Sequence, residues 1–145
     1  MKIHRIDHVG VIVHDLPAAK AFFFDLGLEV LGEGELQGEL VDRANGLDDV
    51  RVAVAMLRVP DGQANIELIQ FYTPSDEKGI RRPLANTPGI RHIAFAVEVI
   101  EAIVAKLKKK GVEFFSEIQD YQGSYKLCLC RGPEGIILEL DEQIK

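Results

Sequence analysis

Two histidines and two glutamates occupy equivalent positions in two similar halves of the chain. "IDHVGVIV" around His8 is matched by "IRHIAFAV" around His92, an offset of 92 − 8 = 84 residues. Each half also has a glutamate inside an apolar run, Glu67 in "NIELI" and Glu139 in "IILEL". Two imidazoles and two carboxylates are a suitable ligand set for a divalent first-row metal ion. The repeat therefore predicts one metal site made of His8, Glu67, His92 and Glu139.

The neighbours of the two histidines indicate a cavity. Side chains alternate between the two faces of a strand, so His8 shares its face with Gly10, and His92 shares its face with Ala94 and Ala96. These small residues cannot fill the space in front of the sheet. We therefore expect the histidine face to line a cavity, and the opposite face to pack against a helix.

The two glutamates follow the same alternation. Glu67 lies between Ile66 and Leu68, so its carboxylate projects from the face opposite to those side chains, and Glu139 repeats the pattern. An unpaired buried carboxylate is costly, so each needs an ionic partner or a bound cation. The alternative is that both glutamates lie on a solvated sheet face, with the histidines as ordinary polar partners.

The remaining histidines and the cysteines are weaker candidates. His4 and His14 are expected at the surface. Cys128 and Cys130 are two residues apart in a strand-like run, where they share a face but are poorly placed for a disulfide. We expect both to be buried thiols that act as small hydrophobic residues.

The order of predicted elements is the same in both halves. The first half predicts a strand over 3–13, a helix from the N-cap Asp15 to a stop at Gly27, a short strand over 28–32, a loop over 33–49, and strands over 50–59 and 64–71. The second half predicts a strand over 90–97, a helix over 100–110 stopped by Gly111, and strands over 112–115, 125–130 and 136–140. The halves, 3–71 and 90–141, are joined by a linker over 72–89. This is a βαβββ pattern repeated within one domain, 1–145, of the α+β class.

Composition excludes several classes of partner. The chain has 145 residues and a net charge of 17 − 23 = −6, without a basic stripe. Nucleic-acid binding needs clustered Lys and Arg, so we expect no nucleic-acid partner. No apolar run approaches the roughly 20 residues of a membrane span, so we expect no membrane partner and a cytoplasmic location.

These sequence motifs resemble those of the vicinal oxygen chelate superfamily. The resemblance rests on "DHVG" and "RHIAF" in the first strands, on "IEL" and "LEL" in the last strands, and on the Pro-x-Gly turns, and it covers roughly residues 3–142. The superfamily includes glyoxalase I, methylmalonyl-CoA epimerase, extradiol dioxygenases, fosfomycin-resistance thiol transferases and bleomycin-resistance proteins. It implies two βαβββ modules that form a paired, cupped mixed sheet around a central metal cavity, commonly in a homodimer.

The same resemblance implies a ligand set and a chemistry. His8, Glu67, His92 and Glu139 are similar to the metal ligands of glyoxalase I, with Ni, Zn, Co, Mn or Fe as the ion. The implied reaction is proton abstraction next to a carbonyl group in a small carbonyl or thioester substrate. Glu139 is the first candidate for the general base, and Glu67 is the second.

The resemblance leaves two alternatives open. An Fe(II) extradiol-type dioxygenase or a thiol transferase would use three of the ligands, His8, His92 and Glu139. A metal-free protein that binds a drug or metabolite, as bleomycin-resistance proteins do, would need no metal. Arg81, Arg82 and Arg91 flank the linker and could meet an anionic substrate, or could be surface charges.

Overall fold

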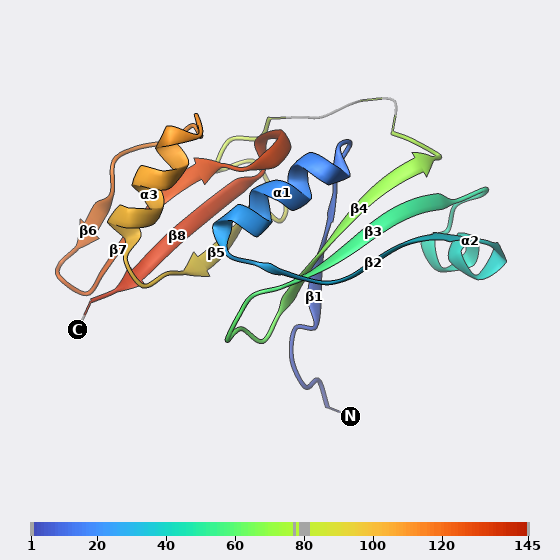
Figure 1. The fold of residues 1–145 in the computed structure, drawn as a ribbon, viewed down its shortest axis with the longest axis horizontal. Helices are drawn as coiled ribbons and strands as arrows, with labels where there is room; N and C mark the ends of the chain where they lie inside the picture. The colour runs from blue at the N-terminus through green and yellow to red at the C-terminus, as the bar shows by residue number, and fades with distance from the viewer. Residues whose placement is uncertain (1, 77, 79–81, 145) are drawn as a thin grey trace. The chain divides into compact units, whose positions relative to one another are not determined.

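The structure, a computed structural model, describes residues 2–76, 78 and 82–144. The chain divides into two compact units, residues 1–79 and 80–145, each with its own sheet (Figure 1). The boundary lies inside the linker predicted over 72–89. Both sheets are four-stranded and mixed, so the predicted α+β class is confirmed.

The first unit follows the predicted βαβββ order and adds one short helix. Its elements are β1 (His8–Ile12), α1 (Leu16–Leu26), β2 (Glu29–Gln37), α2 (Glu39–Asn45), β3 (Arg51–Arg58) and β4 (Asn65–Thr73). The strand order in the sheet is β1-β4-β3-β2, with β1 parallel to β4 and the other pairs antiparallel. The strand that carries His8 is therefore hydrogen-bonded to the strand that carries Glu67.

The second unit repeats this topology. Its elements are β5 (His92–Ala96), α3 (Ile100–Lys109), β6 (Gln119–Tyr121), β7 (Tyr125–Arg131), a single 3-10 turn (Pro133–Gly135) and β8 (Ile137–Gln143). The strand order is β5-β8-β7-β6, and β5 is parallel to β8. His92 and Glu139 therefore lie on neighbouring parallel strands, as His8 and Glu67 do.

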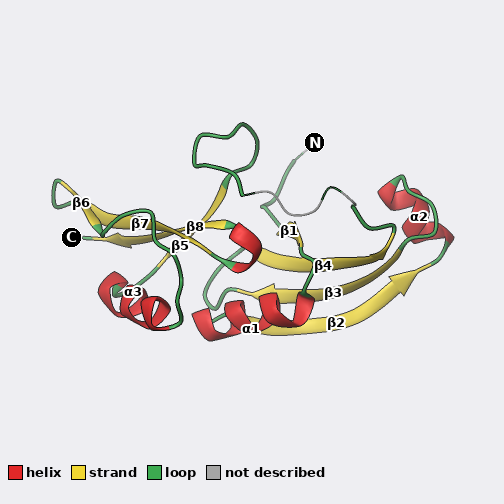
Figure 2. Cartoon of the chain, turned by 90° about the horizontal axis from the view of Figure 1, so that it is seen from above, coloured by secondary structure: helices red, strands yellow, loops and turns green. Residues whose placement is uncertain are grey.

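One face of each sheet is covered by a helix (Figure 2). α1 contacts β3 and β4, and α3 contacts β8. The aliphatic residues that flank the two glutamates face these helices and are buried; they are Ile66, Leu68, Leu138 and Leu140. The alternation predicted from sequence is therefore confirmed, because the histidine and glutamate side chains point to the other, uncovered face.

Side chains from the last strand of each unit fix the start of the helix. In the first unit Asp15 caps α1 by accepting a hydrogen bond from the Ala18 amide at 3.0 Å, as predicted, and the helix stops at Gly27 in the left-handed conformation. The Leu16 amide also donates to Gln70 on β4 at 3.0 Å. In the second unit the Ile100 amide donates to the Glu142 carboxylate on β8 at 2.8 Å. Each helix is thus tied to the strand that carries the glutamate of its pair.

Two predicted segments of the first unit differ in the structure. The strand predicted over 3–13 begins only at His8, because the structure pairs β1 with β4 from that residue onward. The short strand predicted over 28–32 extends to Gln37, since it pairs with β3 along its length. The loop predicted over 33–49 therefore contains half of β2, and it also contains α2, which Gly38 and Gly46 bound in positive-φ conformations.

The strand predicted over 112–115 is wrong. Within this segment only Phe114 forms a bridge, to Cys130, and the second strand of this unit forms later, at β6. The Phe115 amide donates to the Leu129 carbonyl at 2.9 Å and the Arg131 amide donates to the Glu113 carbonyl at 2.9 Å. The segment therefore follows β7 through scattered backbone hydrogen bonds instead of a regular ladder.

The expectation that the two cysteines are buried thiols is confirmed. Cys128 is 1% exposed and Cys130 is 0% exposed, and their partners across the ladder are Leu140 and Leu138. Burial raises the pKa of both thiols, that of Cys130 to about 12. At neutral pH both thiols are therefore protonated and act as packing groups.

This burial predicts a loss of stability at alkaline pH. Between the ordinary thiol pKa of 9.0 and about 12, the Cys130 thiol ionises only in the unfolded chain, so its contribution to stability is complete below pH 9 and falls as the pH rises. The fall is about 1.4 kcal/mol per pH unit. Between pH 8 and 10.5 we expect the wild type to lose about 2 kcal/mol more free energy of unfolding than Cys130→Ala. Urea unfolding of both chains at the two pH values measures this difference, and equal losses would contradict the burial of this thiol.

No helix in the described part of the chain is long and apolar enough to cross a membrane. The longest of the described helices, α1, has 11 residues.

Candidate functional site

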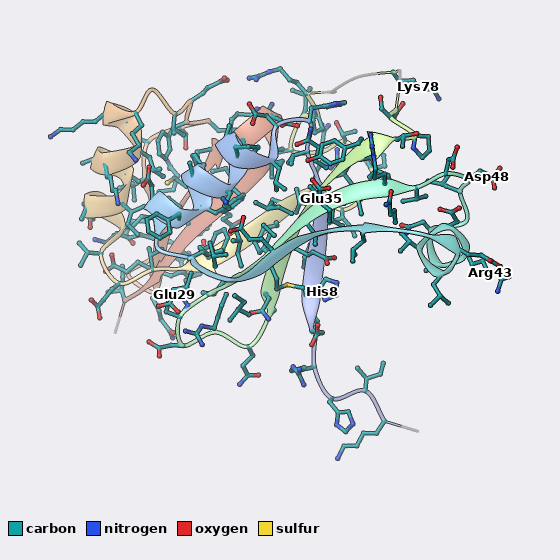
Figure 3. The ribbon with its side chains drawn as sticks, turned by 45° about the vertical axis from the view of Figure 1, so that its right-hand side comes forward. His8, Glu29, Glu35, Arg43, Asp48 and Lys78 are labelled. Atoms are coloured by element: carbon teal, nitrogen blue, oxygen red, sulfur yellow. The ribbon has the colours of Figure 1, made fainter. Side chains whose placement is uncertain are left out.

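The first unit brings His8 and Glu67 together on the uncovered face of its sheet. His8 begins β1 and Glu67 lies near the start of β4, and the strand register pairs Gly10 with Glu67. The Nε2 atom of His8 lies 3.4 Å from Oε1 of Glu67. The side chains are 38% and 24% exposed, so both remain accessible from solvent. Figure 3 labels His8 on its strand.

Asp7 holds the other ring nitrogen of His8. Its Oδ2 atom lies 2.8 Å from Nδ1 of His8, and its Oδ1 atom accepts a hydrogen bond from Arg5 at 2.9 Å. The hydrogen bond to Asp7, followed by the charge of Glu67, raises the pKa of His8, whereas the same hydrogen bond and Arg5 lower the pKa of Asp7. In the neutral imidazole this arrangement favours the proton on Nδ1, which leaves the Nε2 lone pair directed toward Glu67.

The Asp7 contact predicts a measurable shift at His8. A carboxylate that accepts a hydrogen bond from the imidazolium favours the protonated form, so Asp7→Asn should lower the pKa of His8 toward 6.5. A pH titration of the histidine ring signals by NMR, on metal-free protein, measures this change. Asp48→Asn, which removes another exposed carboxylate of the same unit, serves as the control. An unchanged pKa of His8 in Asp7→Asn would rule out the hydrogen bond as the cause.

The second unit repeats the pair with His92 and Glu139. The strand register pairs Ala94 with Glu139, and Nε2 of His92 lies 3.4 Å from Oε1 of Glu139. The side chains are 44% and 18% exposed. Here Arg91 takes the position of Asp7, and its guanidinium donates to the carbonyl of its neighbour Ile90. Among the described residues no carboxylate bonds to Nδ1 of His92, so the two histidines have different surroundings.

Glu139 has a second carboxyl group beside it. Burial, and next the hydrogen bond with Asp141, raise the pKa of Glu139, while His92 lowers it. Asp141 follows Glu139 by two residues in β8, so both side chains lie on the face of the sheet that carries His92. Glu139 is thus a carboxyl group whose ionisation is displaced toward neutral pH, as general bases in enzymes often are.

The face beside both pairs is open to solvent within each unit, and the cavity expected there from the small neighbours stays a prediction. Gly10 is exposed, and a methyl group added at its Cα would meet only the end of the Ile69 side chain, at 3.9 Å. Ala94 and Ala96 are exposed as well. Each His–Glu pair therefore faces space that a ligand can enter from its own unit.

The donor atoms of each pair fit a metal ion. Two ligand atoms that each lie about 2.1 Å from one ion at a tetrahedral angle are roughly 3.4 Å apart. Both pairs have this separation, 3.4 Å. Over the described ranges, no third His, Cys, Asp or Glu joins either pair in a group that could hold a metal ion. Each unit therefore supplies two donors, an imidazole and a carboxylate.

The other residues singled out from sequence lie outside these pairs. His4 and His14 are exposed, as expected. Arg82 donates to Glu113 at 2.7 Å. Arg91 bonds to the backbone of its neighbour Ile90, and Arg81 lies outside the described residues.

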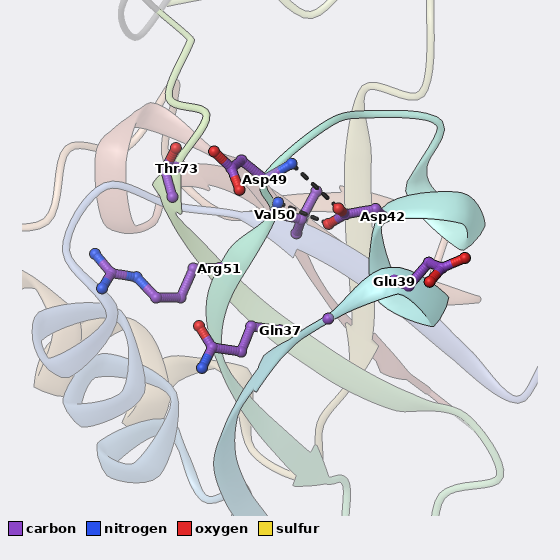
Figure 4. A pocket seen from close by; sticks show the side chains of 8 residues that line it. Gln37, Glu39, Asp42, Asp49, Val50, Arg51 and Thr73 are labelled. Carbon is purple, nitrogen blue, oxygen red and sulfur yellow. Dashed lines mark hydrogen bonds between the residues drawn. The ribbon is translucent and has the colours of Figure 1, made fainter.

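A separate pocket of about 730 Å³ lies in the first unit at the other end of β4 (Figure 4). Asp42 holds one wall by accepting hydrogen bonds from the Val50 amide at 2.8 Å and the Asp49 amide at 3.2 Å. Thr73, which also lines the pocket, is six residues beyond Glu67, roughly 20 Å along the strand. The pocket is therefore separate from the His8–Glu67 pair.

Comparison with known proteins identifies the family. A model of the Glyoxalase/Bleomycin resistance protein/Dioxygenase superfamily matches residues 7–129. The chain belongs to this superfamily, which is the vicinal oxygen chelate superfamily indicated by its motifs.

Individual relatives agree with this placement. The uncharacterized protein YaeR of Escherichia coli (strain K12) is 32% identical over 141 residues, covering 97% of this chain and 98% of the relative. The crystal structure of a glyoxalase family protein from Bacillus cereus has a TM-score of 0.95 at 37% identity, covering 100% of this chain and 97% of that one. Glyoxalase I of Leishmania major, a trypanothione-dependent enzyme, has a TM-score of 0.65 at 22% identity, covering 95% and 86%, and shares the fold.

Proposed function

We propose that the chain is a glyoxalase-like metalloenzyme, a lyase or isomerase that removes a proton from a carbon next to a carbonyl group. The observation that carries this proposal is the repeated His–Glu pair. Each unit presents an imidazole nitrogen and a carboxylate oxygen 3.4 Å apart on the uncovered face of its sheet. Membership of a superfamily that includes glyoxalase I supports the same reaction class.

In this proposal His8, Glu67, His92 and Glu139 together hold one divalent ion, which is Ni, Zn, Co, Mn or Fe. When bound, the ion supplies Lewis-acid stabilisation of the negative charge that develops on the substrate oxygen. Asp7 keeps the Nδ1 proton of His8 in place, so that the Nε2 atom of the ring is available as a donor.

Glu139 is the proposed general base and Glu67 the second candidate. In this step the Glu139 carboxylate would leave the ion, accept the proton from the substrate carbon and return it to the deprotonated substrate, which forms the product. Its side chain is the less exposed of the two glutamates, at 18% against 24%, and Asp141 stands beside it. The substrate is a small carbonyl compound or thioester, and the chain is proposed to act as a homodimer in the cytoplasm.

Deuterium exchange tests the proposal directly, because it detects removal of the proton whichever product is formed. The chain, loaded with each of the five metal ions in turn, is incubated in D₂O with a panel of carbonyl compounds and thioesters. The panel includes the hemithioacetal of methylglyoxal with glutathione and methylmalonyl-CoA. We expect one of the metal-loaded forms to exchange the hydrogen next to the carbonyl group, as seen by proton NMR, and the chelator-treated chain to be inactive. Equal exchange by both forms would contradict a metal-dependent enzyme.

A further inference from the structure

Each unit carries an arginine at the same point of its sheet. Arg58 stands in "RVPDG" at the end of β3, and Arg131 stands in "RGPEG" at the end of β7. Arg58 pairs with Asn65, which pairs with His8. Arg131 pairs with Ile137, which in turn pairs with His92. Because residues in register across a sheet share a face, both arginines lie on the face of the His–Glu pairs.

In the first unit the arginine is neutralised by the protein itself. Nε of Arg58 donates to Oε1 of Glu29 at 3.0 Å, and Nη2 donates to the same oxygen. Glu29 lies opposite Arg58 on β2, and Figure 3 labels it there. Nε and Nη2 form the edge of the guanidinium that binds a carboxylate side-on. In the first unit this edge therefore holds a carboxylate.

In the second unit the equivalent glutamate has a different partner. Glu113 corresponds to Glu29, since 113 − 29 = 84 is the offset of the early part of the repeat. Its carboxylate accepts a hydrogen bond from Arg82 at 2.7 Å. Only its backbone carbonyl bonds to Arg131, through the Arg131 amide at 2.9 Å. Arg82 is thus the ionic partner of the Glu113 carboxylate, which by analogy with Glu29 in the first unit would otherwise pair with Arg131.

The guanidinium of Arg131 is held in place by contacts that do not use its Nε–Nη2 edge, the edge that can bind a carboxylate. Its Nη1 donates to the Gly135 carbonyl at 3.1 Å, and its Cζ lies over the Phe115 ring, 4.9 Å from the centroid. Nε of Arg131 is buried and has no hydrogen-bond partner among the described residues. A buried donor without a partner is uncommon in folded proteins because its lost hydration is not compensated, so this group calls for an explanation.

We propose that the Nε–Nη2 edge of Arg131 binds a carboxylate group of the substrate. This inference rests on the proposed function and narrows its substrate class to small carbonyl compounds or thioesters that also carry a carboxylate. The matching edge of Arg58 shows the chemical group that this position accepts. Glu139 lies two residues beyond Ile137, the partner of Arg131, so it is a diagonal neighbour with a Cα separation of about 7–8 Å. One small molecule can therefore reach both side chains.

Entry of the carboxylate requires the groups that bury Nε to move. Phe115, which lies over Cζ of the same guanidinium, is 40% exposed, so its ring can shift toward solvent without opening the core. After the carboxylate has bound, the ring could return over Cζ and reduce the access of water to the ion pair. The lower local dielectric strengthens an ion pair of this kind.

Propionate is the probe for this site, with propionamide as the uncharged control. The full chain is titrated as purified and after chelator dialysis, and the arginine Nε–Hε signals are followed by NMR. We expect the Nε–Hε signal of Arg131 to shift on addition of propionate but not of propionamide. The dissociation constant for propionate should be of the order of 1 mM. Arg131→Gln should weaken binding at least about tenfold, and Arg131→Lys, which lacks the bidentate edge, should also weaken it. Arg58→Gln is the matched control and should bind as the wild type does.

A second pair of variants tests the role of Arg82. Arg82→Gln releases the Glu113 carboxylate, which should then compete for Arg131 and weaken propionate binding. The double variant Arg82→Gln/Glu113→Gln should bind propionate as the wild type does. A general disturbance of the fold would not give this recovery. The inference is overturned if the wild type binds no propionate, or if Arg131→Gln binds it equally well. The titration is also made on chelator-treated chain. A lack of propionate binding can therefore be distinguished from a lack of metal binding, which would count against the proposed function instead.

Discussion

Glu139→Gln is expected to lower the rate of metal-dependent proton exchange by about 10²–10⁴-fold. Glutamine matches glutamate in size but cannot accept a proton from a carbon acid, so the change removes the proposed general base and keeps the shape of the site. Glu139 is the stronger candidate because its side chain is the less exposed of the two glutamates and has the Asp141 carboxyl group beside it. The measurement is the rate of deuterium incorporation at saturating metal, together with the metal content of the variant.

Glu67→Gln is the matched comparison, since Glu67 holds the same position in the first unit. We expect this variant to bind metal more weakly and to regain exchange activity when excess metal is added. Full activity of Glu139→Gln together with inactive, metal-saturated Glu67→Gln would reverse the two roles. In that case Glu67 would be the base and Glu139 a ligand only.

The second large effect is expected from the histidines. His8→Ala or His92→Ala should each raise the dissociation constant of the metal by more than about 100-fold. Loss of a group that only orients a metal ligand lowers metal affinity by about 10–100-fold, and loss of the ligand itself should lower the affinity further. Both side chains are more than one third exposed, so neither substitution hollows the core. Isothermal titration of the chelator-treated chains measures the affinities, and circular dichroism checks the fold.

His4→Ala and His14→Ala serve as controls, because both residues are exposed and lie outside the two pairs. They should bind metal as the wild type does. A requirement for His8 but not His92 would assign the ion to the first unit alone. Wild-type affinity in both His8→Ala and His92→Ala would contradict the proposed ligands altogether.

The part of the fold that holds the candidate site could be predicted from the sequence. Period-two alternation around His8 and His92 is strong evidence for strands with one helix-facing side, and the repeat indicates which strands correspond. Where periodicity is weak, local signals mislead: the segment 112–115 has the composition of a strand, but in the structure only one residue of it bridges to β7. β2 continues through Gly34 because pairing with β3 compensates for the low strand preference of glycine.

Other features of the site depend on distances that a sequence does not contain. Asp7 precedes His8 in the chain, but only the structure shows its carboxylate 2.8 Å from Nδ1. The different partners of Glu29 and Glu113 likewise depend on Arg82, which lies 31 residues before Glu113. The arginine that begins both "RVPDG" and "RGPEG" is a signal that the sequence itself contains. Repeated positions of a duplicated chain are thus worth comparing for chemistry as well as for fold.

Metal stoichiometry tests the central claim most directly. The chain is purified without a metal-affinity tag, and its content of Ni, Zn, Co, Mn and Fe is measured by elemental analysis before and after incubation with each ion. A site shared by both His–Glu pairs predicts about one ion per chain, lost in His8→Ala and in His92→Ala. Two ions per chain would mean that each pair binds its own metal. No metal, with none taken up on addition, would contradict the metalloenzyme account.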